Sequence, residues 1–384
     1  MKIASMGLRP HYLLDVLIGA FAVLTLAVFW HLAGSIGNRK LRLWTRCGLM
    51  LAAGVVIAGV ALAPIRISRH MPREITPWVR AAALLTSAWA IYSIPVLAVL
   101  RWTSSGSSTE RRQMLRKVAG AAIALPGALA SVAFLRRDDL QLREFDIVVP
   151  GLAADLHGLR LVQISDIHLG VFVSEDLLTR AVAMANETKA HIALVTGDLI
   201  STVGDPLDLC LQRLKSLRSD AGTFGCMGNH EIYALAEAYT AREGARHGIR
   251  FLRQQSQVLR FGSSSMNLIG VDYQRRQNPY LVGADALVEP GMTNVLLSHN
   301  PDVFPVAASQ GFDLTIGGHT HGGQVNFEIL ERNVNIARFF TPYIYGRYSR
   351  DGKSLFVTRG VGTVGAPARL GAPPEVALIR LCAS

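Results

Sequence analysis

Histidine, aspartate and asparagine side chains recur in five short segments of the sequence. The segments are Asp166-Ile167-His168, Gly197-Asp198, Gly228-Asn229-His230-Glu231, Ser298-His299-Asn300 and Gly317-Gly318-His319-Thr320-His321-Gly322-Gly323-Gln324. Carboxylate, amide oxygen and neutral imidazole, without a thiolate, suit divalent ions of the Mn, Fe or Zn kind. The candidate ligands are Asp166, His168, Asp198, Asn229, His299, His319 and His321. They are too many for one ion, so a pair of ions is the economical interpretation.

A pair of ions has a defined chemistry. Two ions about 3.5–4 Å apart, joined by one bridging carboxylate, generate a hydroxide at neutral pH and clamp an in-line displacement at phosphorus. Each segment alone has a structural explanation, because an aspartate often sits in a turn and an asparagine often caps a helix. Their joint occurrence in order, each after a β-rich run, favours a phosphoesterase.

The elements that must position these residues are those of an α/β domain. Leu159–Ser165 and Ile192–Thr196 read as buried strands that end at Asp166 and Asp198, with a helix over Glu175–Glu187 between them. This order predicts parallel pairing, with ligands at the carboxyl ends of the strands. Further strands are predicted at Phe224–Met227, Asn267–Val271, Val295–Ser298, Leu314–Ile316, Leu355–Thr358 and Val376–Leu381, and helices at Leu207–Leu217, Ala234–Arg246 and Val303–Ala308.

The order of these motifs resembles the calcineurin-like metallophosphoesterase superfamily, from about Leu159 to the end of the chain. The segment from Gly317 to Gln324 and the closing stretch from Arg359 to Glu375 are similar to its membrane-associated branch. That branch includes transmembrane proteins with a metallophosphoesterase domain and enzymes similar to UDP-2,3-diacylglucosamine hydrolase. The resemblance implies an α/β/β/α sandwich of two stacked mixed sheets flanked by helices.

The resemblance also implies roles for single residues. Asp166, His168, Asp198 and His321 would hold one ion; Asp198, Asn229, His299 and His319 would hold the other, with Asp198 as the bridge. His230 would be the catalytic residue that does not bind metal, and would stabilise charge on the phosphoryl oxygens or protonate the leaving oxygen. Glu231 would either orient His230 or serve as a carboxylate at a helix N-terminus. Manganese is the first choice of metal, with iron or zinc as alternatives.

The N-terminal third has a different composition. Half of the 384 residues are hydrophobic, and the formal net charge is +11. Four apolar stretches, Leu13–Ala33, Cys47–Ile65, Trp78–Leu100 and Val118–Leu135, each approach the length of about 20 residues that crosses a bilayer. We therefore predict a membrane domain over residues 1–136 with four transmembrane helices, and a metallophosphoesterase domain over residues 137–384.

Charge and cysteine usage exclude other classes. There are 15 Lys and Arg against three Asp and Glu up to Leu135, and 24 against 25 afterwards, so the positive charge lies among the apolar runs. Nucleic acid is therefore not an expected partner. Cys47, Cys210, Cys226 and Cys382 form no Cys-x-x-Cys pair, which argues against a zinc ribbon or a thioredoxin-like site, while one disulfide among the last three stays open.

Basic residues predict the orientation. The first and third loops carry the larger clusters, at 39–46 and 101–117, whereas the N-terminus has Lys2 and Arg9 and the second loop Arg66, Arg69 and Arg73. The positive-inside rule then places the catalytic domain in the periplasm or outside the cell. Arg111-Arg112 before the fourth apolar run is similar to a twin-arginine export signal, either cleaved or retained, and is equally explained as the basic flank of a span.

These observations predict a membrane-anchored phosphodiesterase or phosphomonoesterase acting by a metal-bridging hydroxide on a membrane lipid or envelope-linked ester. One alternative is a UDP-2,3-diacylglucosamine pyrophosphohydrolase of lipid A synthesis, which requires the opposite topology. Another is a non-catalytic membrane sensor or binding module, which would be expected to have lost ligands. An aromatic cluster of Phe339, Phe340, Tyr343, Tyr345 and Tyr348 could face lipid or cap the site, and a core strand is the favoured interpretation.

Overall fold

The computed structural model describes residues 12–34, 38–61, 74–104, 108–275, 279–329 and 332–383. The chain divides into two compact units, Met1–Val132 and Ala133–Ser384. The predicted boundary, between residues 136 and 137, directly follows the end of the last long N-terminal helix at Leu135.

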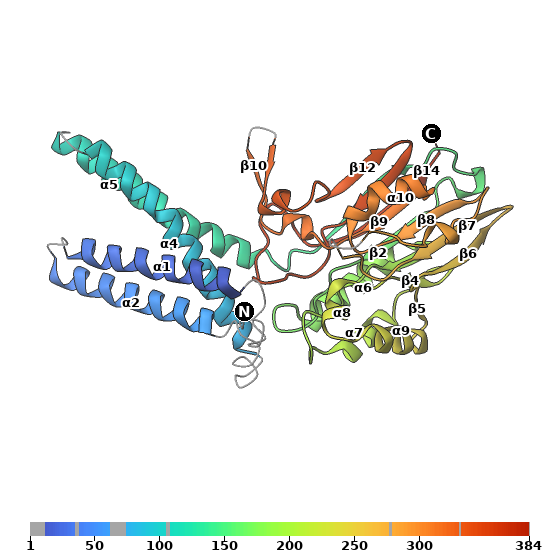
Figure 1. Cartoon of the computed structure of the whole chain (residues 1–384), viewed down its shortest axis with the longest axis horizontal. Helices are drawn as coiled ribbons and strands as arrows, with labels where there is room; N and C mark the ends of the chain where they lie inside the picture. The colour runs from blue at the N-terminus through green and yellow to red at the C-terminus, as the bar shows by residue number, and fades with distance from the viewer. Residues whose placement is uncertain are drawn as a thin grey trace, which may run out of the picture. The chain divides into compact units, whose positions relative to one another are not determined.

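The first unit consists of long apolar helices (Figure 1). They are α1 (Tyr12–Ala33), α2 (Arg39–Ala61), α4 (Thr76–Ser104) and α5 (Thr109–Leu135). The first three pack on one another. Glycine makes close approach possible: a Cβ on Gly19 of α1 would lie 2.5 Å from Val60 Cγ2 of α2. Small residues at such crossings are typical of membrane helices, where backbones approach closely.

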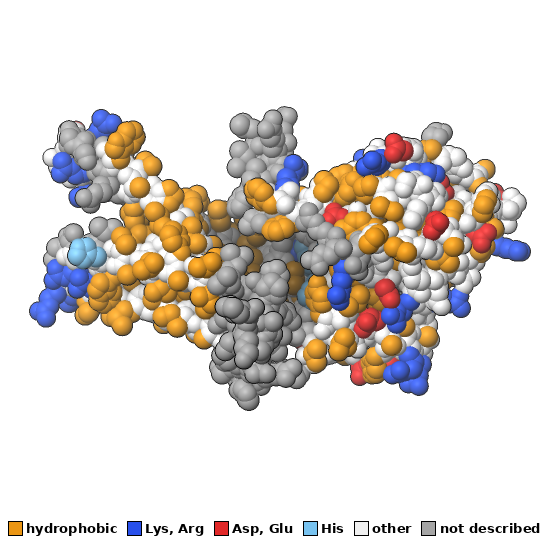
Figure 2. Space-filling view, viewed as in Figure 1, with side chains coloured by type: hydrophobic (Ala, Val, Ile, Leu, Met, Phe, Trp, Pro, Cys, Tyr) orange, Lys and Arg blue, Asp and Glu red, His pale blue; other side chains and the backbone are white. Residues whose placement is uncertain are grey.

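These helices expose apolar side chains rather than a polar face, as Figure 2 shows. Among the described residues, three helical segments are long and apolar enough to cross a membrane: Arg42–Ala61, Thr76–Val99 and Thr109–Leu135. A shorter apolar segment, Val16–His31, lies in α1. Three of the four predicted spans thus meet the length criterion. The basic residues predicted to orient the N-terminus and the second loop lie in residues 1–11 and 62–73, outside the described residues.

The second unit contains two six-stranded mixed sheets. The first sheet has the order β1-β14-β2-β3-β4-β5. Its strands are β1 (Gln141–Val148), β14 (Glu375–Cys382), β2 (Arg160–Ile164), β3 (Ile192–Val195), β4 (Thr223–Gly225) and β5 (Ile249–Phe251). Strands β2 to β5 run parallel, while β14 is antiparallel to β2 and parallel to β1.

The second sheet has the order β12-β13-β9-β8-β7-β6. Its strands are β12 (Gly346–Arg350), β13 (Lys353–Val357), β9 (Leu314–Gly317), β8 (Thr293–Leu297), β7 (Ser264–Gly270) and β6 (Gln255–Phe261). The four inner strands are parallel, and β12 and β6 close the edges as antiparallel strands.

The two sheets stack face to face. One core cluster joins inward side chains of both sheets, such as Leu161 and Leu194 of the first with Val295 and Leu314 of the second. Helices α6 (Glu175–Glu187) and α7 (Leu207–Leu214) cover the outer face of the first sheet, and α10 (Phe304–Gln310) covers that of the second. The predicted α/β/β/α sandwich is therefore confirmed.

Shorter elements complete the unit. They are the helices α8 (Asn229–Tyr233) and α9 (Glu237–Arg246), the hairpin strands β10 (Phe327–Ile329) and β11 (Arg332–Val334), and the 3-10 turns η1 (Ala154–Leu156), η2 (Asp285–Leu287), η3 (Pro301–Val303), η4 (His321–Gly323) and η5 (Ile336–Phe339). The single helix predicted over Ala234–Arg246 was wrong at its start, because the chain turns at Leu235, which has φ +55°, before α9 begins.

Candidate metal centre

Five parallel strands deliver the candidate ligands to one place. Asp166 and His168 follow β2, Asp198 follows β3, and Asn229 follows β4, all in the first sheet. His299 follows β8, and the pair His319 and His321 follows β9, in the second sheet. Because parallel strands present their carboxyl ends at the same edge, the two stacked sheets bring these side chains together. Six of the seven predicted ligands lie in clusters of ligand atoms there, and Asn229 follows β4 at the same edge.

The backbone at these positions is unusual. Asp166, His168, Asp198, His319 and His321 all have positive φ, between 51° and 75°. Non-glycine residues adopt this region at a cost of about 1–3 kcal/mol each, and such strain gathers at functional sites. The turn into Asp198 is made by Gly197, at φ +87°, where a Cβ would lie 2.5 Å from Gly228 N and 2.9 Å from His299 Nδ1.

Two clusters of ligand atoms share this edge. Asp166, His168 and His321 form the first, in which His321 Nε2 lies 3.1 Å from His168 Nε2 and 3.5 Å from Asp166 Oδ1. Asp198, His299 and His319 form the second. Asp198 Oδ2 lies 3.0 Å from His299 Nε2 and 3.5 Å from His168 Nε2, so this carboxylate reaches both clusters.

Two buried atoms test whether these residues fit a cation. His299 Nδ1 donates to the carbonyl oxygen of Thr196 at 2.6 Å, so its Nε2 is directed at the carboxylates. That Nε2 lies 3.0 Å from Asp198 Oδ2 and 3.9 Å from Asp166 Oδ1, whereas the buried side-chain oxygen of Asn229 has no hydrogen-bond partner. Buried polar atoms without a partner are rare and costly. A site rich in convergent acceptor atoms is what a divalent ion satisfies, so the residues fit the predicted metals.

Electrostatics divides the histidines into two kinds. Burial, with a smaller effect of the charge on His299, lowers the pKa of His168 to about 3 and that of His319 to about 4, although Asp198 acts to raise both. Burial also acts to lower the pKa of His299, but the adjacent carboxylates of Asp198 and Asp166 outweigh it and raise that pKa to about 10. Without a metal, a proton on His299 therefore supplies the positive charge that the carboxylates require.

His230 stands beside the clusters. Its Nδ1 lies 2.5 Å from the carbonyl oxygen of Ser201, and its ring meets that of His168 edge to face, with centroids 4.7 Å apart. A nitrogen of His230 comes within 4.8 Å of the ligand atoms of His168 and Asp198. Because Nδ1 is hydrogen-bonded to the Ser201 carbonyl oxygen, Nε2 is the ring nitrogen that can contact a bound molecule.

Glu231 does not orient His230, contrary to one of the two predicted roles. Its carboxylate is fully buried and accepts three backbone N–H groups: Asp198 at 2.9 Å, Leu199 at 2.8 Å and Gly228 at 2.8 Å. Gly228 directly precedes α8, so the bond from Gly228 N–H places the Glu231 carboxylate at the N-terminus of that helix. This bond agrees with the second of the two predicted roles. The carboxylate ties the Asp198 loop to the Asn229 loop.

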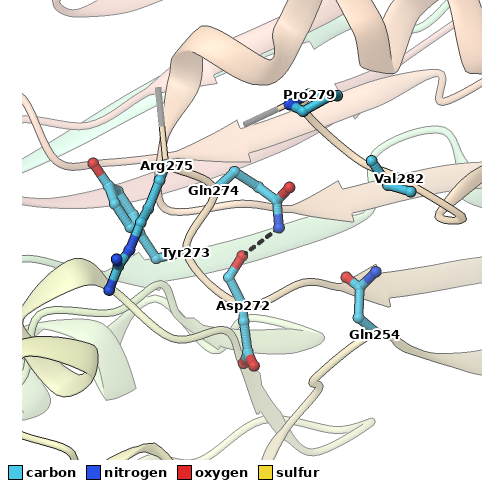
Figure 3. A pocket seen from close by; sticks show the side chains of 7 residues that line it. All are labelled: Gln254, Asp272, Tyr273, Gln274, Arg275, Pro279 and Val282. Carbon is cyan, nitrogen blue, oxygen red and sulfur yellow. Dashed lines mark hydrogen bonds between the residues drawn. The ribbon is translucent and has the colours of Figure 1, made fainter. Parts of the chain in front are cut away.

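Sequence reasoning missed Tyr273, which lies just beyond β7. Its ring packs against those of His299 and His319, with centroids 6.1 Å and 5.3 Å away, and its hydroxyl lies 3.5 Å from His319 Nε2. Tyr273 also lines an open pocket of about 510 Å³, shown in Figure 3, together with Gln254, Asp272, Gln274, Arg275, Pro279 and Val282. No motif marks this tyrosine, although its place after a predicted strand was a usable signal.

Arg369 was also missed as a contributor to the site. It is buried, with 1% of its surface exposed, and donates to the carbonyl oxygens of His321 at 2.9 Å and Ala372 at 3.2 Å. A buried guanidinium bound to main-chain carbonyls fixes the chain on both sides of it. The closing segment thereby holds the His321 turn in place.

The predicted aromatic cluster is not one structure. Tyr343 and Tyr348 pack edge to face and join a core cluster with Phe304, as a core interpretation requires. Phe339 and Phe340 are exposed instead, at 86% and 63%, because they end and follow the short turn η5 rather than a strand. For these two residues the core prediction was wrong.

Comparison with known proteins gives a consistent result. A family model described as calcineurin-like phosphoesterase matches residues 159–323. The chain is 28% identical over 244 residues to an uncharacterized metallophosphoesterase of Campylobacter jejuni, covering 63% of this chain and 63% of that protein. It is 30% identical over 237 residues to an uncharacterized metallophosphoesterase of Aquifex aeolicus, covering 58% of this chain and 85% of that protein.

An animal relative has a similar description. The chain is 29% identical over 251 residues to the transmembrane protein with metallophosphoesterase domain of Danio rerio, covering 62% of this chain and 56% of that protein. The alignments thus span 63% of the Campylobacter protein and 60% of a Helicobacter pylori relative, less than two thirds of either.

Proposed function

The chain belongs to the calcineurin-like phosphoesterase family, and from that premise we propose that it is a membrane-anchored hydrolase of phosphate esters with a two-ion centre. The observation that carries the proposal is the pair of ligand clusters that meet at Asp198. Asp166, His168, Asp198 and His321 would hold one ion, and Asp198, Asn229, His299 and His319 the other. Manganese is the first choice, with iron or zinc as alternatives.

Two ions, when bound, supply a hydroxide nucleophile at neutral pH and neutralise charge on the phosphoryl oxygens. The chain's own residues supply the rest. His230 donates Nδ1–H to the Ser201 carbonyl, and in its imidazolium form it would present Nε2–H to the leaving oxygen, transfer that proton and return to the neutral ring. Glu231 fixes the backbone of Asp198, and Arg369 fixes that of His321, so the ligands are held in place before substrate arrives.

The proposed substrate is a phosphate ester of a membrane lipid or an envelope component, with the catalytic domain in the periplasm or outside the cell. Long apolar helices in the same chain support this, because anchoring raises the effective concentration at a bilayer surface. A C-terminal alkaline phosphatase fusion tests the orientation. Activity of the fused reporter supports the proposal, whereas an inactive reporter with a fluorescent GFP fusion favours the cytoplasmic pyrophosphohydrolase alternative.

Hydrolysis by the full chain in detergent tests the reaction itself. The substrates are bis-(p-nitrophenyl) phosphate and p-nitrophenyl phosphate, with the protein stripped of metal and then supplied with Mn, Zn or Mg. We expect metal-dependent turnover that falls by at least about 100-fold in Asp198→Ala and in His230→Ala. His157→Ala, an exposed histidine remote from the site, is the control. Turnover that survives Asp198→Ala would refute the two-ion mechanism, and a folded chain that binds metal without turnover favours the binding-module alternative.

A further inference from the structure

The apolar side chains exposed on the second unit are not evenly spread. Among the described residues that follow α5, the most exposed large hydrophobic side chains are 57% to 87% exposed: Val203, Tyr233, Leu235, Val282, Phe339 and Phe340. Other large hydrophobic residues after α5 reach no more than 49%. All six lie in the segments that follow the carboxyl ends of β3, β4, β7 and β9, the edge at which the metal centre lies. We name these six residues the rim.

Contacts and short stretches of chain connect the rim to the metal centre on each side. The ring of Tyr233 meets that of His230 with centroids 5.7 Å apart, and Leu235 follows two residues later. Val203 follows Ser201, whose carbonyl oxygen binds His230 Nδ1.

On the side of the second sheet, Val282 lines the same pocket as Tyr273, which contacts His319 (Figure 3). The turn η5, which ends at Phe339, packs against η4, which begins at His321. The rim therefore surrounds the centre, with residues from loops of both sheets.

The composition of the rim indicates its partner. Exposed arginines accompany the apolar residues: Arg338 precedes Phe339, and Arg275 lines the pocket beside Val282. Aromatic and aliphatic side chains next to basic residues are the pattern by which proteins insert into the interface of an anionic bilayer. Apolar residues gathered on one face, rather than scattered singly, mark a binding surface.

The chain itself brings a bilayer close. Helix α5 is apolar and long enough to cross a membrane, and it ends at Leu135. Only residues 136–140 separate it from β1, which begins at Gln141. Five residues extend over at most about 18 Å, so a membrane crossed by α5 is within reach of the unit that β1 belongs to.

We propose that the rim docks on the lipid bilayer, so that the metal centre opens toward the membrane and takes a phosphate ester whose acyl chains remain in the bilayer. The rim residues enter the interface, and Arg275 and Arg338 meet lipid phosphates. The choice of a lipid as substrate rests on the proposed function; the docking itself does not. A second segment of this chain or another protein on the rim would be the competing occupant.

Quenching by brominated lipid tests the docking without any catalysis. The full chain, with Cys47 and Cys382 replaced by serine, carries a single new cysteine at Phe339, at Leu235 or, as the control, at Val258 on the edge strand β6. Each is labelled with the fluorophore NBD and reconstituted into phosphatidylcholine and phosphatidylglycerol vesicles, with or without brominated acyl chains. We expect at least twofold quenching at positions 339 and 235 and none at 258. Equal fluorescence in both lipids at 339 and 235 would overturn the proposal.

A second arm tests the lipid substrate. The double variant Phe339→Ser and Phe340→Ser is compared with the unaltered chain on vesicle-embedded phosphatidyl-p-nitrophenol and on soluble bis-(p-nitrophenyl) phosphate. We expect the ratio of lipid to soluble turnover to fall at least fivefold. An unchanged ratio would overturn the lipid assignment. If neither ester is hydrolysed by the unaltered chain, the proposed function fails, while the quenching result decides the docking by itself.

Discussion

Glu231→Gln should weaken both the fold and metal binding, although Glu231 is not itself a proposed ligand. The buried carboxylate accepts three backbone N–H groups, those of Asp198, Leu199 and Gly228. Burial, and after it the charge of Asp198, raises the pKa of Glu231 above its usual value, and the three N–H groups offset part of that rise. Since all three contacts are donors to the carboxylate oxygens, the geometry favours the ionised form near neutral pH.

The magnitude follows from these bonds. In glutamine one oxygen becomes an NH₂ group, so at least the N–H of Leu199, or those of Asp198 and Gly228, faces a donor instead of an acceptor. Losing one charge-assisted bond costs about 1.5–3 kcal/mol, and loss of a buried charge beside Asp198 offsets part of this. We expect a net loss of about 1–2 kcal/mol, equal to a fall in melting temperature of about 2–8 °C for a domain of this size.

The assay combines thermal unfolding of the full chain in detergent with calorimetric titration of Mn. Loosening the backbone of Asp198 should raise the dissociation constant about 10- to 100-fold, as removal of an outer-shell partner typically does. Glu187→Gln, at an exposed position near the end of α6, is the matched control. If Glu231→Gln melts and binds metal as the unaltered chain does, Glu231 is protonated in the fold and the argument is refuted.

Three further predictions concern neighbouring residues. Because the pKa of His299 is raised to about 10, metal must displace its proton at any pH below about 10, so the apparent metal affinity should rise about tenfold per pH unit in that range. Titration in buffers of different ionisation enthalpy would show one proton released, and an affinity independent of pH would contradict this. Tyr273→Phe removes the hydroxyl that lies 3.5 Å from His319 Nε2. This variant should lower turnover of bis-(p-nitrophenyl) phosphate about two- to tenfold and keep its metal affinity. An unchanged turnover rate would show that the Tyr273 hydroxyl does not take part in the reaction. Gly197→Ala should destabilise the fold by at least about 3 kcal/mol in thermal melts, because the new Cβ would clash with the Gly228 backbone. Gly151 also has a positive φ but no atom within 4 Å of such a Cβ, so Gly151→Ala should cost only about 1 kcal/mol.

The metal-centre residues could be predicted from the sequence because each is tied to a strand end. Strands β2 and β3 are short apolar runs, and a carboxylate within a local motif follows each within three residues, Asp166 after β2 and Asp198 after β3. Such signals are local, so they survive without knowledge of the partner strands. The edge strands β1, β6 and β12 were not predicted, because half of their residues face solvent and their pattern is weak.

Long-range contacts could not be predicted from the sequence, for a different reason. Glu231 is adjacent to His230, which suggested that it orients that histidine, yet its carboxylate reaches back to Asp198 and Leu199 on another loop. The hydrogen-bond partner of His230 is the carbonyl oxygen of Ser201. Every residue has such a main-chain acceptor, so the amino-acid types do not indicate which one is used. Tyr273 and Arg369 act through packing and carbonyl contacts that depend on how the two sheets meet.

That meeting of the sheets explains why the centre needs both halves of the domain. Asp166, His168, Asp198 and Asn229 come from the first sheet, whereas His299, His319 and His321 come from the second. Neither sheet alone therefore offers a complete ligand set for either of the two ions that we propose. Without metal the junction is held by a proton on His299 between two carboxylates. With metal, the same carboxylates and imidazoles would be drawn to shared ions, and binding energy would act directly on the contact between the sheets. Five of these residues have a strained backbone with positive φ. The fold tolerates this strain because the contact between the sheets and the core between them hold those backbone conformations in place.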